Sequence, residues 1–346
     1  MPPENSTTEL TPSEQRSLIV FVIYATQGLI VGGSNFVIVL AIVRFKALRN
    51  SKEYQIILGV SLADSLNMLA YILAGTRRSY LMMTGDFKNF LTALECILRS
   101  HNLLWSFTEH LSGAVLAVVS VDRLLAVTKP LYYTKLTSRY TMGLMGGIYV
   151  YTVVTGTCMS VLQVALLDPQ PTQSSLCYMG PTVLTGVATP YVYYYIYAGS
   201  VFAAFSVLLY MIVYTVHKKK HNQVQGTNSS ASQQLRLKRQ RQLTVTLGIS
   251  CMCTFFVFVV PYVIGYTLSY LDLNYIPKWV VLAMFVVCNL NPFCNVFIYA
   301  LRHSEMKKAV HAMFMCKTMP SHLSLWKSNT GASAQSARAL TNTNHH

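Results

Sequence analysis

The chain has 346 residues, of which 53% are hydrophobic and only 11% are charged. This composition and the mean hydropathy of +0.40 exclude a soluble domain, whose surface needs about 25–35% charged residues. The net charge of +15 would suggest nucleic acid as the partner of a soluble protein. Here the basic residues lie between apolar segments, so we expect the lipid bilayer as a partner and no nucleic acid.

Seven apolar segments each approach the length of about 20 residues that a membrane-spanning helix needs. They cover residues 18–43, 54–76, 97–121, 141–167, 191–216, 243–270 and 279–301. The predicted fold class is therefore an all-α membrane protein with a seven-transmembrane helix bundle. Because seven is odd, the two ends of the chain are expected on opposite sides of the membrane.

The basic residues predict which side each end occupies. Of the 27 Lys and Arg residues, 21 fall after the first, third, fifth and seventh segments, and such residues favour the cytoplasmic side. We therefore expect a multi-pass plasma-membrane protein with an extracellular N-terminus and a cytoplasmic C-terminus.

This topology divides the chain into four regions. They are an extracellular leader (1–17), the seven-transmembrane domain (18–301), a short amphipathic helix (302–316) and a disordered cytoplasmic tail (317–346). Asn5 begins an Asn-Ser-Thr glycosylation sequence, although such tripeptides also arise by chance. Cys316 is a candidate for palmitoylation, with a plain surface thiol as the alternative.

Two of the eight cysteines are expected at the outer, oxidising surface, namely Cys96 and Cys177. We predict that they form a disulfide between the second outer loop and the top of the third helix. The alternative is a pair of unrelated free thiols.

Polar side chains inside the apolar segments are costly in lipid and therefore informative. Those near mid-depth are Asn35, Asp64, Ser112, Asn291 and Asn295. A buried carboxylate such as Asp64 must be neutralised, hydrogen-bonded or paired with a cation. Surrounded by serine and asparagine oxygens, it can hold a small hard cation such as sodium. The alternative is a water-filled polar cluster that holds the helices together.

One face of the third segment carries a stripe of residues that extends from one side of the membrane to the other. Helical spacing places the following residues on one face: Trp105, Glu109, Ser112, Leu116, Val119 and Arg123. At its inner end Asp122 and Arg123 form a charge-assisted pair that can break. The alternative is an arginine that only anchors the helix at the membrane surface.

With these motifs in order, the chain resembles the rhodopsin-like G-protein-coupled receptors over nearly its whole length. The matching residues are Gly32-Gly33-Ser34-Asn35, Leu62-Ala63-Asp64, Val121-Asp122-Arg123, Lys129-Pro130-Leu131, Pro261-Tyr262 and Asn295 to Tyr299. The resemblance implies coupling to a heterotrimeric G protein through Arg123 and no enzymatic activity. It implies that Asp122, Pro261, Asn295 and Tyr299 occupy switch positions. It also implies an allosteric sodium ion at Asp64, Ser112, Asn291 and Asn295, and no other cofactor.

The chain departs from this family pattern at activation positions. Leu124 stands where many members have Tyr, Val259 where the family has Trp, and Val296 where it has Pro. Because Pro292 lies four residues before Val296, the kink in the seventh helix is expected about one turn nearer the outside. Arg241 matches the position of an acid that would pair with Arg123, so no ion pair between helices three and six is expected.

The ligand is expected between helices three, five, six and seven. Trp105 stands where amine receptors carry Asp, which disfavours a simple monoamine. Glu109, one turn deeper, would bind a ligand cation, stay protonated, or hydrogen-bond to a neighbouring helix. Tyr262 and Tyr266 share one face and are candidate contacts for a small molecule or peptide, although interfacial belts also explain tyrosines there.

The family resemblance leaves the type of receptor open. Asn289 replaces the Schiff-base lysine of opsins. The runs Leu-Arg-Asn-Ser-Lys-Glu-Tyr and Leu-Ala-Asp-Ser are similar to nematode serpentine chemoreceptors of class SX, which implies a chemosensory role. The alternatives are a protein of receptor fold that binds ligand without signalling and a membrane transporter, for which no internal repeat is visible.

Overall fold

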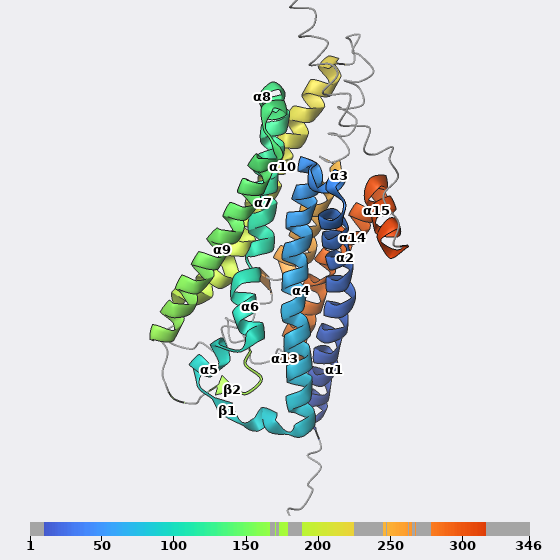
Figure 1. Ribbon diagram of the computed structural model, residues 1–346. Coiled ribbons are helices and arrows are strands. Elements are labelled where there is room, and N and C mark those ends of the chain that lie inside the picture. The colour runs from blue at the N-terminus through green and yellow to red at the C-terminus, as the bar shows by residue number, and fades with distance from the viewer. Residues whose placement is uncertain are drawn as a thin grey trace, which may run out of the picture.

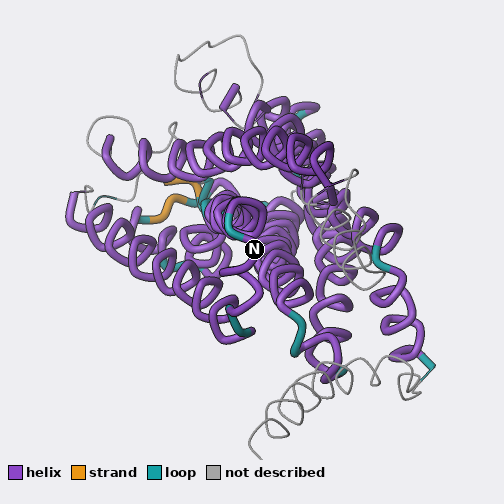
Figure 2. The backbone as a smooth tube through the Cα atoms, turned by 90° about the horizontal axis from the view of Figure 1, so that it is seen from above, coloured by secondary structure: helices purple, strands orange, loops and turns teal. Residues whose placement is uncertain are grey.

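The computed structural model describes residues 10–166, 170, 173–178, 189–224, 245–246, 248–261, 263–264, 267 and 278–315. Within these ranges the chain is almost entirely helical. The long helices run side by side along one direction (Figure 1), and a view turned by 90° shows them gathered into one bundle (Figure 2). The predicted all-α class is confirmed.

The first long helix combines α1 (Pro12–Gln27), η1 (Gly28–Gly32) and α2 (Gly33–Arg44). It begins before the predicted apolar segment because Thr11 and Glu14 form a capping box: the Thr11 hydroxyl accepts from the Glu14 amide, and the Glu14 carboxylate accepts from the Thr11 amide at 2.8 Å. η1 is one wide π turn inside the helix.

The second long helix, α4 (Lys52–Thr84), follows the short α3 (Lys46–Arg49) and packs against the first helix, α6 and α7. It ends at Gly85, whose positive φ of 81° is the left-handed conformation that glycine adopts at little cost.

The third long helix consists of α6 (Ser100–Thr108) and α7 (Leu111–Thr128). Glu109 and His110 keep right-handed helical backbone angles between the two, so the stripe of side chains predicted for this helix continues through an irregular turn. α8 (Pro130–Lys135) follows at once; Pro130 suits a first helical turn because it has no backbone N–H to leave unbonded.

Two more long helices, α9 (Ser138–Leu166) and α10 (Thr189–Val224), complete this side of the bundle. α10 lies against α7 at a very close approach, where a Cβ atom added to Gly113 would overlap the carbonyl oxygen of Gly199. Glycine at position 113 therefore permits the contact.

The predicted sixth and seventh segments are described in part. η4 (Thr254–Val259) is a π turn within a helix just before Pro261. α13 (Lys278–Cys288) and α14 (Leu290–Arg302) are separated at Asn289. This break lies three residues before Pro292, where the sequence predicts a kink.

Five helices of the described part are long and apolar enough to cross a membrane. They are Pro12–Arg44, Lys52–Thr84, Ser100–Thr128, Ser138–Leu162 and Tyr197–Val216. Two shorter apolar helices, Gly248–Val259 and Val286–Tyr299, lie in the predicted sixth and seventh segments. Many large apolar side chains point outward, among them Leu29, Ile30, Phe36, Val150 and Val161. Such exposure is unfavourable in water and fits a lipid environment.

The buried apolar side chains form two clusters. One surrounds Ile42, Ile57, Val119 and Tyr299. The other, near the predicted disulfide, gathers aromatic residues of three helices: Phe21, Tyr24, Tyr71 and Trp105.

A small cap of structure closes one end of the bundle, which we call the disulfide end. It contains η2 (Asp86–Lys88), β1 (Phe90–Leu91), α5 (Ala93–Ile97) and β2 (Gln173–Ser174). The two strands are antiparallel, with Phe90 opposite Ser174. Cys96 and Cys177 are joined by a disulfide, as predicted. The other end of the bundle is called the Arg123 end.

A separate helix, α15 (Ser304–Phe314), follows α14 at the Arg123 end and lies apart from the bundle axis (Figure 1). It buries Met306, Ala309 and Ala312 and contacts α2. The Tyr54 hydroxyl donates to the Glu305 carboxylate at 3.0 Å, which ties α15 to the start of α4. The amphipathic helix predicted over 302–316 thus corresponds to α15.

Candidate functional site

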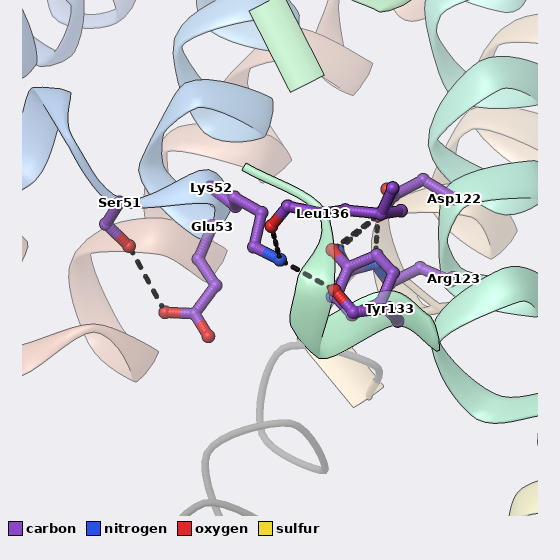
Figure 3. A network of polar contacts seen from close by, with 7 residues as sticks. All are labelled: Ser51, Lys52, Glu53, Asp122, Arg123, Tyr133 and Leu136. Atoms are coloured by element: carbon purple, nitrogen blue, oxygen red, sulfur yellow. Dashed lines mark hydrogen bonds and ion pairs between the residues drawn. The ribbon is translucent and has the colours of Figure 1, made fainter. Parts of the chain in front are cut away.

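A buried ion pair lies at the Arg123 end, where α7 meets α8 (Figure 3). Arg123 donates from Nε to Asp122 Oδ2 at 3.0 Å, and its Nη2 also contacts that oxygen. The two residues are 2% and 0% exposed. In such a dry environment the pair is stable only if its hydrogen bonds are well satisfied.

Tyr133 completes this pair and was not among the residues predicted from the sequence. Its hydroxyl accepts from Arg123 Nη2 at 2.7 Å and donates to Asp122 Oδ2 at 3.1 Å. Burial raises the pKa of the Tyr133 phenol above its ordinary value, so the hydroxyl keeps the proton that it donates. One phenol thus bridges the acid and the base.

Lys52 positions Tyr133 from the start of α4. Its Nζ donates to the backbone carbonyls of Tyr133 and Leu136 at 2.9 and 2.8 Å, and lies 4.3 Å from the Tyr133 ring centroid (Figure 3). Both carbonyls lie at the end of the short helix α8, where few intrahelical donors remain, and that of Tyr133 accepts from the Leu136 amide as well, at 3.3 Å. The sequence did contain a signal for this contact. Pro130 favours the start of a helix, and in a helix the adjacent Tyr132 and Tyr133 point in different directions, so one of them can face the bundle.

A second buried cluster surrounds Asp64 in the middle of the bundle. Asn295 Nδ2 donates to Asp64 Oδ2 at 2.9 Å, and Ser112 lies within hydrogen-bonding reach of the same carboxylate. The Ser250 hydroxyl donates to Asn295 Oδ1. Asp64 and Asn295 are each 1% exposed, so α4, α7, α14 and the helix that contains Ser250 meet through polar groups in a dry core.

The remaining mid-depth residues extend this cluster. Thr254 donates to Asn291 Oδ1 at 2.9 Å, which links η4 to α14. Asn35 donates from Nδ2 to the Pro292 carbonyl at 3.3 Å and to the Val31 carbonyl at 3.1 Å. The structure therefore brings all five polar residues predicted near mid-depth into one region.

The cluster fits a sodium ion in its chemistry and only partly in its arrangement. Asp64 and Ser112 provide converging oxygens, and hard cations prefer oxygen ligands. Asn295, however, turns its amide nitrogen toward Asp64, while the oxygens of Asn295 and Asn291 accept from hydroxyls. A sodium ion would have to replace the bond between Asn295 and Asp64. Across the described ranges no three His, Cys, Asp or Glu side chains gather as a metal site.

A third polar cluster, also missed, joins α7, α10 and the helix that contains Cys251. The Ser120 and Ser206 hydroxyls are 2.7 Å apart, so one of them donates to the other, and each lies within hydrogen-bonding distance of the Leu116 carbonyl, at 2.9 and 3.1 Å. Cys251 Sγ lies 3.3 Å from the Ser206 hydroxyl. The rule that polar groups in a span are informative would have singled out both serines.

Comparison with known families agrees with this arrangement. The family described as "7 transmembrane receptor (rhodopsin family)" matches residues 34–299, which is well over half of the chain. The chain belongs to the rhodopsin family of seven-transmembrane receptors. No curated protein matches it. The resemblance to nematode chemoreceptors stays a prediction.

In this rhodopsin-family receptor, the predicted switch residues occupy four places. Asp122 and Arg123 form the pair at the Arg123 end, and Asn295 holds Asp64 in the middle. Tyr299 is fully buried in the apolar cluster around Ile42. Pro261 follows the π turn η4 and is partly buried.

Two of the predicted ligand contacts of the receptor, Trp105 and Glu109, lie toward the disulfide end. Trp105 is buried, with its ring centroid 5.1 Å from that of Tyr71 and 5.8 Å from that of His101. Glu109 is also buried and lies near enough to Cys288 for an electrostatic interaction. Tyr262 and Tyr266 lie outside the described residues, as do Asn5, Arg241 and Cys316.

Proposed function

We propose that this rhodopsin-family receptor converts the binding of an extracellular small molecule or peptide into activation of a heterotrimeric G protein, in a chemosensory role. The observation that carries the proposal is the buried cluster of Asp122, Arg123 and Tyr133. The cluster holds the guanidinium of Arg123 at the end of a membrane-spanning helix. Arg123 can exchange its two partners there for others. A partner protein that offers acceptor oxygens can compete for this guanidinium.

The proposed orientation places the disulfide end outside the cell and the Arg123 end in the cytoplasm. Two observations support it: the excess of basic residues in the loops at the Arg123 end, and the Cys96–Cys177 disulfide, which needs an oxidising compartment. With this orientation a ligand binds near Trp105 and Glu109, and the G protein binds near Arg123.

The proposed mechanism is a shift between two arrangements of the helices. In the resting arrangement, Tyr133 and Asp122 hold Arg123. A ligand that binds more tightly to an arrangement with the sixth helix displaced about Pro261 shifts the population toward it. The mid-depth cluster lies between the two ends and touches this helix through Ser250 and Thr254, so its hydrogen bonds must rearrange when the helix moves.

The test compares G-protein activation in cells that express the wild type or Arg123→Ala at equal surface density. Basal signalling and responses to a ligand library are recorded with several G-protein reporters. We expect the Arg123→Ala signal to fall to background. Arg139→Ala is the matched control because Arg139 is an exposed basic residue at the same end; it should signal normally.

The opposite outcome favours the alternative function. If a ligand binds the wild type and no G protein responds, the chain binds ligand without signalling. Leu124, Val259 and Val296, which replace the usual residues at activation positions, would then explain the loss of coupling. Uptake of the ligand into cells would instead indicate a transporter.

A further inference from the structure

A group of basic side chains lies at the disulfide end, away from the clusters described above. Arg77 and Arg78 extend from α4, and Arg99 and His101 lie at the start of α6. Arg77 interacts electrostatically with Arg78 and Arg99, and all three arginines act on His101. Like charges this close repel one another, so the group favours the approach of a negative charge.

Arg78 is the most enclosed of these basic residues, with only 2% of its surface exposed. It donates from Nε to the Leu176 carbonyl and from Nη2 to the Cys177 carbonyl, each at 2.9 Å. Its guanidinium carbon lies 5.1 to 5.6 Å from the ring centroids of three aromatic residues: Phe21, Trp105 and Tyr178. These contacts fix the cation in place beneath the disulfide.

Two buried groups beside Arg78 have hydrogen-bonding atoms without a partner among the described residues. They are Trp105 Nε1 and one ring nitrogen of His101, whose other ring nitrogen interacts with the Cys177 backbone. The nearby Cys177 carbonyl already accepts from Arg78 and from Asn102 Nδ2, the latter at 3.3 Å. Burying a donor without an acceptor is unfavourable, and an acceptor placed between these two rings would relieve that cost.

Glu95 is an acid of the described residues that interacts electrostatically with this group, through Arg99. It is exposed and already accepts from Thr92 in the capping box of α5, at 2.8 and 2.9 Å. Glu95 therefore belongs to the surface of the cap and does not supply the missing acceptor between Trp105 and His101.

We propose that the ligand of this receptor is an organic anion whose acidic group binds at Trp105 and His101 beside Arg78. The acidic oxygens would accept from the indole N–H and from the imidazole N–H, which would turn away from the crowded Cys177 carbonyl, and the adjacent guanidinium would stabilise the charge. The rings of Phe21, Tyr71 and Tyr178 suit an aromatic or aliphatic body. The proposal rests on the proposed receptor function and replaces a cationic ligand at Glu109 with an anionic one nearer the disulfide.

The test measures ligand binding to the purified full-length receptor in detergent, without any G protein. Thermal unfolding is followed with benzoate, with phenyl phosphate, and with benzamide and benzylamine as neutral and cationic probes of similar shape. We expect the two anions to raise the unfolding temperature in a saturable way, and benzamide and benzylamine to have no effect.

Three variants locate the site. Trp105→Phe keeps an aromatic ring and removes the N–H, and should weaken anion binding by about tenfold. Arg78→Gln should weaken it further; if that variant does not fold because it loosens residues 176–178, Trp105→Phe still decides. Lys88→Gln, an exposed basic residue at the same end, is the control and should bind like the wild type.

Several results would overturn the proposal. These are no stabilisation by either anion, equal stabilisation by benzamide, anion binding unchanged in Trp105→Phe, and stabilisation by benzylamine that is lost in Glu109→Gln. Because the readout needs no G protein, the two proposals fail separately. Anion binding without any signal would refute coupling alone, and signalling by a neutral or cationic ligand would refute the anion site alone.

Discussion

Tyr133 shows how one hydroxyl can control a buried charge. It gives a hydrogen to Asp122 and takes one from Arg123, so it stabilises both charges at once. Hydrogen bonds to charged groups contribute about 1.5–3 kcal/mol. Its loss should therefore weaken the resting arrangement more than the loss of an ordinary surface contact would.

Tyr133→Phe should raise basal G-protein signalling, because the resting state alone loses this bond. A cost of about 1.4 kcal/mol corresponds to about a tenfold change in an equilibrium, so an increase of that order is expected. The measurement is ligand-free reporter activity at matched surface expression. Tyr132→Phe is the control, since Tyr132 is 55% exposed. Equal basal activity in the two variants would show that the hydroxyl does not hold the resting state.

Asp64 provides a second test with single residues. If sodium binds there, replacing potassium by sodium should stabilise the purified wild type, by about 1.4 kcal/mol at ten times the dissociation constant. Asp64→Asn removes the charge that attracts the ion and should abolish the difference in thermal unfolding. Asp86→Asn, at an exposed site, should keep it. A wild type that unfolds equally in both salts would identify the cluster as hydrogen-bonded and ion-free.

At the scale of the helices, the contact between α7 and α10 depends on the lack of a side chain at position 113. An added Cβ would overlap the Gly199 carbonyl oxygen and lie 3.1 Å from its carbon. Backbone cannot move aside as a flexible side chain can, so the two helices would have to separate. The same pair of helices carries Ser120 and Ser206, whose 2.7 Å contact would be disturbed as well.

Gly113→Ala should therefore destabilise the receptor by about 1–3 kcal/mol or more and lower its surface expression. Gly143→Ala is a matched control in α9, because nothing lies within 4 Å of its added Cβ. Removing backbone freedom there should leave stability unchanged or raise it by about 0.4–1 kcal/mol. Thermal unfolding of the purified variants separates the two cases. Similar losses in both would indicate that α7 and α10 can adjust.

The disulfide acts at the scale of the whole molecule, because Cys96 and Cys177 are 81 residues apart in the chain. A cross-link over such a loop typically contributes about 2–4 kcal/mol. It also holds the segment whose carbonyls bind Arg78. Its removal should therefore affect both folding and the disulfide end.

Replacing both Cys96 and Cys177 by Ala should lower the unfolding temperature and the amount of receptor at the cell surface. Cys158→Ala is the control, since that cysteine is exposed and free. Unchanged stability of the double variant would show that β1, β2 and the Arg78 contacts hold the segment without the bond.

Much of the molecule could be predicted from its sequence, because spans, charge bias and cysteine placement are local properties. The buried pair of Asp122 and Arg123 followed from adjacent residues. The position of Tyr133 did not, since a loop helix has to fold back to bring it there. The inward direction of the Arg78 side chain could not be predicted either. The sequence indicates only that a charge lies near the membrane surface, and packing among aromatic rings decides where this side chain points.

Hydrogen-bond direction was also beyond the sequence. The sequence places Asp64, Asn291 and Asn295 at similar depth, but an amide offers both a donor and an acceptor. Which one faces Asp64 depends on Ser250 and Thr254, two hydroxyls on another helix. The rotation of each helix about its axis decides which amide atom faces Asp64, and the spacing of residues in the sequence does not predict that rotation.

The π turns η1 and η4 have a consequence for insertions and deletions. A π turn is equivalent to an α-helix with one residue inserted. Deleting a residue from Thr254–Val259 would allow a regular α-helix to form, and the residues beyond the turn would keep nearly the same direction, because the wide turn uses one extra residue to complete one turn. A single deletion within the turn should therefore leave the rest of the helix facing the same neighbours. In comparisons with relatives that lack the turn, residues beyond it need a one-position gap before they are matched.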